Sequence, residues 1–265
     1  MAIQSPLRLA FADLFAGFMR YDLWPSLAWQ EIRRRYRRST LGPLWLTIST
    51  GAFIMGLGPL YGKLFNQELS SYLPYIAISF VLWALLSGMI TDACNVFVAE
   101  ESIFKQIKLP FTLFCFSLVT RNLIILAHNA VILLIVFLFY PPPLTTALFV
   151  VPIGLFLIAI NGLWVALTLG LLCTRFRDIT QIVSSVLQLT MFVTPVMCKA
   201  DMVGRHTLIV YWIAMNHFLE IVRAPLYGHM PSQTTWLAIG IITVLGWSGT
   251  MLVFARYRSR IPYWV

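Results

Sequence analysis

Six long apolar stretches constrain the fold of this chain more than any other feature. Each is close to or above the ~20 residues that an α-helix needs to cross the hydrocarbon core of a membrane. Only 11% of the 265 residues are charged and 59% are hydrophobic, so the chain lacks the polar side chains to cover a soluble globule. The sequence therefore predicts an all-α integral membrane protein with six transmembrane helices, at about residues 43–62, 72–98, 111–140, 144–174, 179–199 and 234–255.

The basic residues predict how these helices are oriented. With the amino terminus in the cytoplasm, fourteen of the nineteen Lys and Arg residues fall on the cytoplasmic side, four fall outside, and Arg121 lies within a span. Such an excess is the usual signal of the cytoplasmic face. We therefore expect both termini in the cytoplasm, and a single domain over residues 1–265 that begins with a cytoplasmic segment, 1–42.

Two segments outside the spans have amphipathic patterns. Near the N-terminus, Leu7, Phe11 and Phe15 recur at helical spacing among charged residues, which is typical of a helix on the membrane surface, although an ordinary packed helix fits equally well. Between the fifth and sixth spans, residues 200–233 alternate apolar with polar side chains. We expect short helices that re-enter the outer leaflet there, with their backbone groups buried against protein.

No residue pattern predicts a catalytic site. The four cysteines lack metal-ligand spacing, and the nearest approach to a phosphate-binding loop, residues 58–64, has the wrong spacing and no Ser or Thr after its lysine. The net charge of +9 is explained by membrane topology and anionic lipid rather than by nucleic acid. We expect no enzyme activity, no metal and no cofactor in this chain, so any energy for transport has to come from another chain.

Polar side chains at membrane depth are the first candidate functional groups. A charge at the bilayer centre costs at least ~2.5–3.5 kcal/mol unless it faces protein or water. Counted from the cytoplasmic helix ends, Asp92 and Arg121 lie roughly 10 and 16 Å deep, an offset that a long arginine spans. We predict an ion pair between them, which either fixes helix packing or contacts substrate. His128 and Asn129 are further intramembrane candidates, with a proton relay through His128 as a weaker hypothesis.

Aromatic residues make up 14% of the chain, and several lie in or near the expected spans. Because aromatic faces stack on the C–H faces of sugars, a path lined with them lets a glycan slide without tight capture. Packing in the core or against lipid is the alternative for each of these side chains. The candidates for such a path are Trp45, Phe53, Tyr75, Trp83 and Trp164.

Two cytoplasmic segments have the composition of partner-binding elements. Residues 24–38 form a basic amphipathic helix before the first span, and residues 100–109 alternate charged with apolar side chains before Pro110. Helices of this kind insert into grooves of soluble partners. Anchoring on anionic lipid is the alternative, and it suits the arginine-rich segment better than the second one.

Several motifs, in order along the chain, resemble the type-2 permease subunits of ATP-binding-cassette (ABC) exporters. The likeness is to those that export lipid-linked O-antigen or capsular polysaccharide, with the O-antigen branch closer. It begins with RYRRSTLGPLWLT (35–47) and extends over nearly the whole chain. The other segments that carry it are YLPYIAISFVLW (72–83), IFKQIKLP (103–110), the RN and HN pairs of the third span, RFRDI (175–179), TPV (194–196), EIVRAPLYG (220–228) and RIPYW (260–264).

The resemblance implies a homodimer of six-span subunits in the bacterial inner membrane, bound to two copies of a separate ATPase that holds ATP and Mg²⁺. Its expected cargo is a polysaccharide carried on undecaprenyl diphosphate. The resemblance also implies that the 24–38 and 100–109 segments contact the ATPase. The residues expected at this interface are Trp29, Glu31, Arg34, Arg35, Glu100, Glu101, Phe104, Lys105 and Lys108.

The resemblance further assigns the two mouths of a transport path. The RFRD turn lies at the inner mouth, where positive charge meets the diphosphate, and residues 205–230 form the periplasmic gate. The sequence departs from the family pattern at His217, where a proline is common, so the start of the gate helix is less sharply set. The assigned residues are Arg37, Arg38, Arg175 and Arg177 along the path, and Asn216, Glu220 and Arg223 at the gate.

Two other kinds of function stay open on the sequence alone. The same fold serves exporters of other cargo, such as capsule, teichoic acid, lipid or drug. A membrane glycosyltransferase or acyltransferase is the second alternative. It needs acidic or histidine clusters at a membrane face, and Glu100 and Glu101 are thin support for one.

Overall fold

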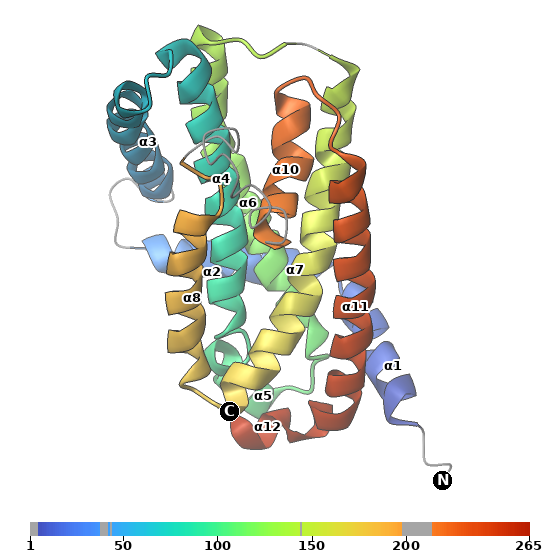
Figure 1. The fold of residues 1–265 in the computed structure, drawn as a ribbon. Coiled ribbons are helices and arrows are strands. Elements are labelled where there is room, and N and C mark those ends of the chain that lie inside the picture. The colour runs from blue at the N-terminus through green and yellow to red at the C-terminus, as the bar shows by residue number, and fades with distance from the viewer. Residues whose placement is uncertain (1–4, 38–41, 43, 144, 198–213) are drawn as a thin grey trace.

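The structure is a computed structural model that describes residues 5–37, 42, 44–143, 145–197 and 214–265; the side chains of Arg35, Tyr36, Phe104 and Lys105 lie outside that description. Over these ranges the chain is helical and contains no strand (Figure 1). Three short 3-10 helices are η1 (Val98–Glu100), η2 (Thr146–Phe149) and η4 (Arg258–Arg260). The α-helices are α1 (Pro6–Met19), α2 (Trp24–Tyr36), α3 (Leu44–Leu64), α4 (Leu69–Ala93), α5 (Glu101–Gln106), α6 (Thr112–Phe139), α7 (Val150–Arg175), α8 (Ile179–Val193), α10 (Ala214–Leu226), α11 (Gln233–Tyr257) and α12 (Ile261–Trp264).

Within the described part of the chain, five helical segments are long and apolar enough to cross a membrane, which confirms the all-helical membrane class. They are α3, α4, α6, α7 with the preceding η2, and α11 with the short helices that follow it. These helices run up and down the bundle, with α5 and α12 at one end (the α12 end) and the α3–α4, α6–α7 and α10–α11 connections at the other (the α10 end; Figure 1). The side of the membrane that each end faces stays a prediction from the basic residues.

The expected fifth span, 179–199, differs from the prediction. In its place α8 has 15 residues, fewer than the other five long helices, and ends at Val193. Thr194 is extended, with ψ of 140°, because the following Pro195 disfavours helical backbone at the residue before it. The described residues thus contain five helices of full spanning length and one shorter apolar helix, instead of six spans.

The N-terminal amphipathic pattern forms α1, which buries its small face and exposes its large one. Ala10, Asp13 and Gly17 are buried, whereas Phe11 and Phe15 are 56% and 63% exposed, as in a helix whose outer face meets lipid. The buried Asp13 carboxylate accepts hydrogen bonds from the backbone N–H and hydroxyl of Thr112, at 3.1 and 3.0 Å. It also pairs with Arg258 at 2.8 Å, so α1 is fixed to the start of α6 and to the C-terminal segment.

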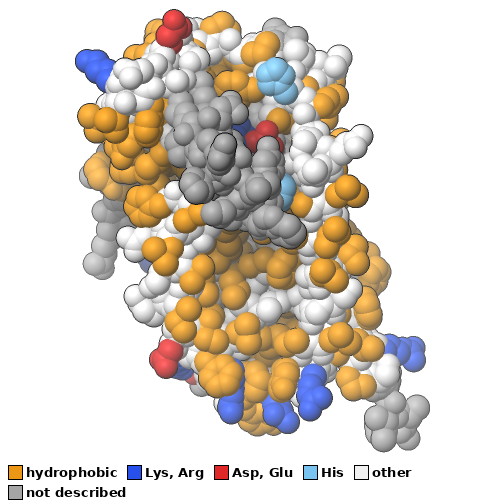
Figure 2. Space-filling view, in the orientation of Figure 1, with side chains coloured by type: hydrophobic (Ala, Val, Ile, Leu, Met, Phe, Trp, Pro, Cys, Tyr) orange, Lys and Arg blue, Asp and Glu red, His pale blue; other side chains and the backbone are white. Residues whose placement is uncertain are grey.

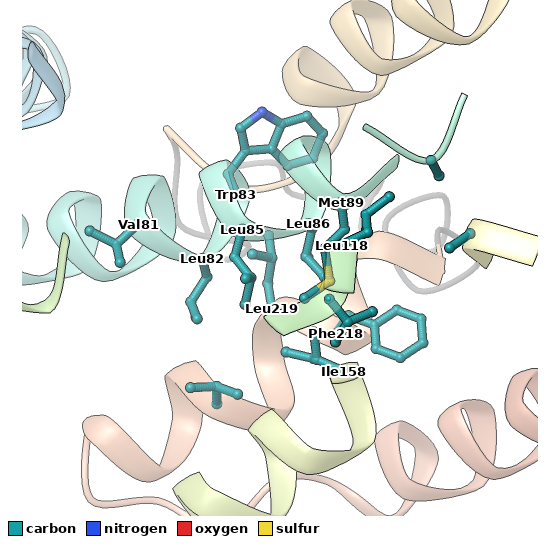
Figure 3. Close-up of a cluster of buried hydrophobic side chains, with 14 of the residues drawn as sticks. Val81, Leu82, Trp83, Leu85, Leu86, Met89, Leu118, Ile158, Phe218 and Leu219 are labelled. Atoms are coloured by element: carbon teal, nitrogen blue, oxygen red, sulfur yellow. The ribbon is translucent and has the colours of Figure 1, made fainter. Parts of the chain in front are cut away.

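The hydrophobic core is centred on α4, which is buried along most of its length. It packs against α3, α6 and α7, and 78% of an apolar stretch of 18 residues in this helix is buried. It therefore has little surface left for lipid. Figure 3 shows Leu86 and Met89 of α4 meeting Leu118 of α6, Ile158 of α7 and Phe218 of α10. The central helix α4 therefore shares one core with α3, α6, α7 and α10.

The amphipathic segment before the last span forms α10, which fits the expectation of a short helix there; residues 200–213 of that prediction lie outside the described chain. α10 packs against α4, α7 and α11 and buries nine of its thirteen residues. A Cβ at Gly154 of α7 would lie 3.1 Å from the Ile221 carbonyl oxygen, so a glycine is needed for this close approach. The helix is therefore an integral part of the core, where its backbone is covered by protein.

Candidate functional site

Arg121 of α6 joins three helices through its guanidinium group. Its Nη2 lies 2.7 Å from the carboxylate of Asp92 at the end of α4, so the predicted ion pair between these residues is present. Its Nη1 donates to the Glu31 carboxylate of α2, a contact that the sequence did not predict. The arginine side chain is only 17% exposed, and the reduced contact with water strengthens both interactions. One arginine therefore links α2 to both α4 and α6.

Asp92 is oriented by a second donor from the same helix as Arg121. The Asn122 amide nitrogen lies 3.0 Å from the Asp92 carboxylate and 3.0 Å from the Leu118 carbonyl of its own helix. A carboxylate held by both an arginine and an amide has little freedom to rotate. Arg121 and Asn122, the RN pair of the third expected span, thus bind the same carboxylate.

Glu100, the last residue of η1, adds a third carboxylate. Its side chain is 9% exposed, lies within hydrogen-bonding reach of Glu31, and makes a contact of 3.6 Å with the exposed guanidinium of Arg34. Burial and then the Glu31 carboxylate raise the pKa of Glu100 from 4.5 to about 7, against the opposing charges of Arg34 and Arg121. Glu100 therefore exchanges its proton near neutral pH.

We call Glu31, Asp92, Glu100 and Arg121 the Arg121 cluster. Two cavities flank it, one of about 250 Å³ between α2, η1 and α6, and one of about 240 Å³ that extends towards Asp92 and Asn95. Glu31, Glu100 and Arg121 line both cavities, so these side chains have open space on two sides. The cluster therefore combines an excess of carboxylates with room to rearrange.

The other residues predicted at a partner interface differ in their exposure. Trp29 of α2 is 48% exposed, Lys108 is exposed, and Glu101 is half-buried at the start of α5. The side chains of Arg35, Phe104 and Lys105 lie outside the described part of the chain. Glu31, Arg34 and Glu100 are brought together, although they come from segments about 70 residues apart in the sequence.

A second buried arginine, Arg223 of α10, donates hydrogen bonds to neutral acceptors near the α10 end. Its Nη1 donates to the Pro195 carbonyl at 2.7 Å and to the Tyr75 hydroxyl at 2.9 Å, and its Nη2 lies 2.7 Å from Glu220. The guanidinium also lies 4.9 Å from the centre of the Tyr75 ring. The Tyr75 hydroxyl donates to the same Pro195 carbonyl, and Tyr72 donates to that of Met197. These contacts hold the non-helical stretch after α8, whose carbonyls have no helical partner.

The remaining polar candidates lie apart from both arginines. The ring Nδ1 of His128 lies 2.8 Å from the Ile124 carbonyl of its own helix, and no described carboxylate pairs with this ring, so the proton-relay hypothesis gains no support. Asn129 and Asn216 are buried, and the side-chain oxygen of each has no partner among the described residues. His217 is buried within α10 and lies 3.3 Å from the Thr235 hydroxyl of α11.

The five aromatic path candidates differ in how far they are exposed. Tyr75 and Trp83 are buried in the core. Trp164 is half-buried and donates from Nε1 to Asn161 at 2.7 Å, whereas Trp45 and Phe53 of α3 are 55% and 49% exposed. Core packing, the alternative weighed for each of them, describes Tyr75 and Trp83.

The predicted basic path residues are exposed where they are described, and Arg38 lies outside that part. Arg37 follows α2, and Arg175 and Arg177 lie at the connection between α7 and α8. Figure 2 shows Lys and Arg side chains gathered at the α12 end beside hydrophobic ones. This is the distribution that the positive-inside pattern predicts for one face of a membrane protein.

A polar stripe on α8 was missed by the sequence analysis. α8 has no buried residue, and its exposed polar side chains recur at helical spacing on one face: Gln181, Ser184, Ser185 and Gln188. The two serine hydroxyls donate to carbonyls one turn back, whereas neither glutamine amide has a partner among the described residues. The signal was present in the sequence as an i, i+3, i+4, i+7 pattern of polar residues within an expected span.

Sequence comparisons match a transporter family and several distant relatives. The sequence profile of the ABC-2 type transporter family matches residues 23–227. The O-antigen export system permease protein RfbA of Myxococcus xanthus is 21% identical over 236 residues, which cover 87% of this chain and 91% of that protein. A protein of the same name from Klebsiella pneumoniae is 22% identical over 184 residues, or 69% of this chain and 71% of its own length.

Proposed function

The chain belongs to the ABC-2 type transporter family, and we propose that it exports O-antigen polysaccharide. An ABC-2 permease has no nucleotide-binding site of its own and works with an ATPase subunit, so the chain is a multi-pass permease and not an enzyme. In this proposal two copies of the chain assemble with two ATPase subunits that bind ATP and Mg²⁺. The complex lies in the bacterial inner membrane, with both termini of the permease in the cytoplasm. The cargo is a polysaccharide on undecaprenyl diphosphate, which is moved to the periplasmic face.

The polar stripe of α8 is the observation that carries the transport proposal. A carboxamide that faces hydrocarbon without a partner costs several kcal/mol, so a face that carries Gln181 and Gln188 needs water or protein beside it. A second exposed side of the same helix, next to the stripe, carries Ile182, Val186 and Leu189, which suit lipid. A helix with one wet and one apolar exposed side fits the wall of a hydrated path. O-antigen as the cargo is supported by the names of two distant relatives.

The Arg121 cluster supports a role for α2 and η1 in coupling to the ATPase. Arg121 of α6 joins α2 to the end of α4, and Glu100 joins the same group from the segment that leads into α5. A displacement of α2 or α5 by a bound ATPase is therefore transmitted to α4 and α6 through these contacts. Trp29, exposed on α2, provides an apolar side chain for that contact.

The direct test is deletion of this chain in its native cell, followed by an assay of lipid-linked polysaccharide on both sides of the inner membrane. We expect glycan to accumulate inside, with none at the surface, and the intact gene to restore export. Unchanged surface glycan contradicts the proposal and favours another cargo. Loss of glycan synthesis, with no precursor on either side, favours a membrane transferase.

Complementation with two variants of α8 tests the path. Gln188→Leu should lower export at least fivefold, because it removes a polar group from the hydrated side. Val186→Leu, on the apolar side of the same helix, serves as the matched control and should export normally. Equal export by both variants contradicts the assignment of the polar stripe to the path.

A further inference from the structure

A cavity of about 310 Å³ lies at the α10 end of the bundle, between the start of α4, the end of α6 and the end of α10. This volume falls within the range of small-molecule sites, about 300–1,000 Å³. We call the cavity the α10-end pocket. The described residues that line it include none from α8, so the pocket is separate from the polar stripe assigned to the transport path.

The lining of the α10-end pocket changes from apolar to polar towards the surface. Its inner part is formed by Pro74 and Ile78 of α4, which are buried in the core. Ser70 and Ser71, one turn nearer the start of the same helix, are exposed and carry hydroxyl groups. No charged side chain is among the described residues that line the pocket. The lining therefore suits an uncharged ligand with both apolar and hydrogen-bonding parts.

The walls of the pocket are held in place by the chain itself. One wall is the run Pro141, Pro142 and Pro143, whose rings fix the backbone angle φ. Gly228 has φ of 80°, and a Cβ there would lie 2.8 Å from Pro143 Cγ, so the turn after α10 approaches this wall closely. The Tyr227 hydroxyl donates to the Ser71 carbonyl at 3.3 Å and ties that turn to α4. A pre-formed pocket loses less conformational entropy when a ligand binds.

Four hydroxyl groups belong to the lining. That of Tyr140, which follows α6, makes no hydrogen bond with any described residue. The Ser70 hydroxyl donates to the Glu68 carboxylate at 3.3 Å, and the Ser71 hydroxyl donates to the Glu68 carbonyl at 3.2 Å. The oxygens of both serines and of Tyr227 still accept hydrogen bonds, because a hydroxyl has two lone pairs. The pocket thus contains one free donor and several acceptors.

Aromatic rings make up much of the remaining lining, from Phe137, Phe139, Tyr140 and Tyr227. The face of an aromatic ring carries partial negative charge. The C–H groups of a sugar ring carry partial positive charge, because each carbon is bonded to oxygen, and the sugar hydroxyls are donors and acceptors. A lipid acyl chain has no use for the four hydroxyls of the pocket. The combination of rings and hydroxyls without a charge therefore favours a sugar ring.

We propose that the α10-end pocket binds one sugar ring of a saccharide. Tyr140 and Tyr227 contribute both a ring and a hydroxyl, and Ser70 and Ser71 bind hydroxyl groups of the sugar at the surface. The proposal rests on the proposed function only for the source of the saccharide, which is then the exported polysaccharide. The binding of a free sugar to this pocket does not depend on transport.

Saturation-transfer NMR titrations of the purified full-length chain in nanodiscs test the site. The probes are the methyl pyranosides of glucose, mannose and galactose, with methoxycyclohexane as the matched ring that lacks hydroxyl groups. We expect at least one of the three glycosides to bind with a Kd at least fivefold lower than that of methoxycyclohexane. Tighter binding of methoxycyclohexane contradicts the proposal and identifies the pocket as a site for an apolar ligand.

Three tyrosine variants locate the binding. Tyr140→Ala removes a ring and a hydroxyl from the pocket and should raise the Kd of the preferred glycoside at least tenfold. Tyr140→Phe keeps the ring and removes a hydroxyl that has no partner in the described chain, so it should raise the Kd two- to fivefold. Tyr263→Ala, which changes a tyrosine that is 86% exposed at the α12 end, is the control and should change the Kd less than twofold. Thermal unfolding of each variant checks that it is folded.

The site is overturned by an unchanged Kd in Tyr140→Ala, or by equal effects of Tyr140→Ala and Tyr263→Ala. Either outcome leaves the proposed function intact, because export is measured independently in cells. Conversely, unchanged surface glycan after deletion of the gene contradicts the export of O-antigen and leaves the binding of methyl glycosides in nanodiscs unaffected.

Discussion

Arg121 and Arg223 are both buried arginines that join several helices, but their surroundings differ in charge and in space. Arg121 binds Glu31 and Asp92, with Glu100 close by, and has cavities on two sides. Arg223 is 7% exposed and binds the Pro195 carbonyl and the Tyr75 hydroxyl, with Glu220 as its one charged partner among the described residues. The first arrangement includes a carboxylate whose pKa is raised to about 7, whereas the second holds a stretch of backbone after α8.

The largest expected effect is that of Arg121→Ala. This change leaves Glu31 and Asp92 without their shared cation, and an uncompensated buried charge costs about 3–5 kcal/mol of unfolding free energy. Denaturant unfolding of the detergent-purified chain measures this loss. Arg34→Ala is the control, because that side chain is 63% exposed and its ion pair contributes less than about 1 kcal/mol. Similar losses of unfolding free energy in the two variants contradict the role of Arg121 as the shared cation of Glu31 and Asp92.

A second prediction concerns pH and applies to the Arg121 cluster alone. The pKa of Glu100 is raised from 4.5 to about 7, so between these values the folded chain keeps a proton that the unfolded chain releases. The unfolding free energy therefore falls as pH rises through this window, by about 3 kcal/mol in total, and is level above it. Unfolding curves from pH 5 to pH 8 measure the slope.

Glu100→Gln should remove this pH-dependent part, because an amide mimics the protonated acid and does not titrate. The exposed Glu68→Gln at the other end of the bundle serves as the control and should leave the slope unchanged. If the difference between wild type and Glu100→Gln is the same at every pH, Glu100 is not the titrating group.

The last prediction concerns the second arginine, and its Glu220→Gln variant is expected to have the smallest effect of all. Arg223→Ala removes hydrogen bonds to Pro195 and Tyr75, and bonds from a charged donor contribute about 1.5–3 kcal/mol. The loss should be the same from pH 5 to pH 8, unlike that of the Arg121 cluster. Glu220→Gln, which alters only the partner that is 33% exposed, should cost less than about 1 kcal/mol. A larger loss in Glu220→Gln than in Arg223→Ala contradicts the neutral character of this site.

The family likeness and the Asp92–Arg121 pair could both be reached from the sequence. The pair was predictable because α4 and α6 are consecutive long helices that run antiparallel, so counting residues from the helix ends gives the depth of each side chain. Glu31 was not assigned to Arg121, because nothing in residues 24–38 fixes how α2 lies across α6. The contact of Tyr75 with Arg223 was not predicted, since the side of α4 that Tyr75 faces depends on where α10 packs.

The sequence by itself determined that the chain is a helical membrane protein, because the length of an apolar run and the spacing of its polar residues are local properties. It also determined most of the long helices to within a few residues. Only the tertiary structure decided that α8 buries none of its residues, that Glu100 meets Glu31, and that the Arg175 guanidinium lies over the Trp264 ring. These contacts join residues far apart in the chain, and they depend on the height and rotation of each helix in the bundle, which the packing of the whole core fixes.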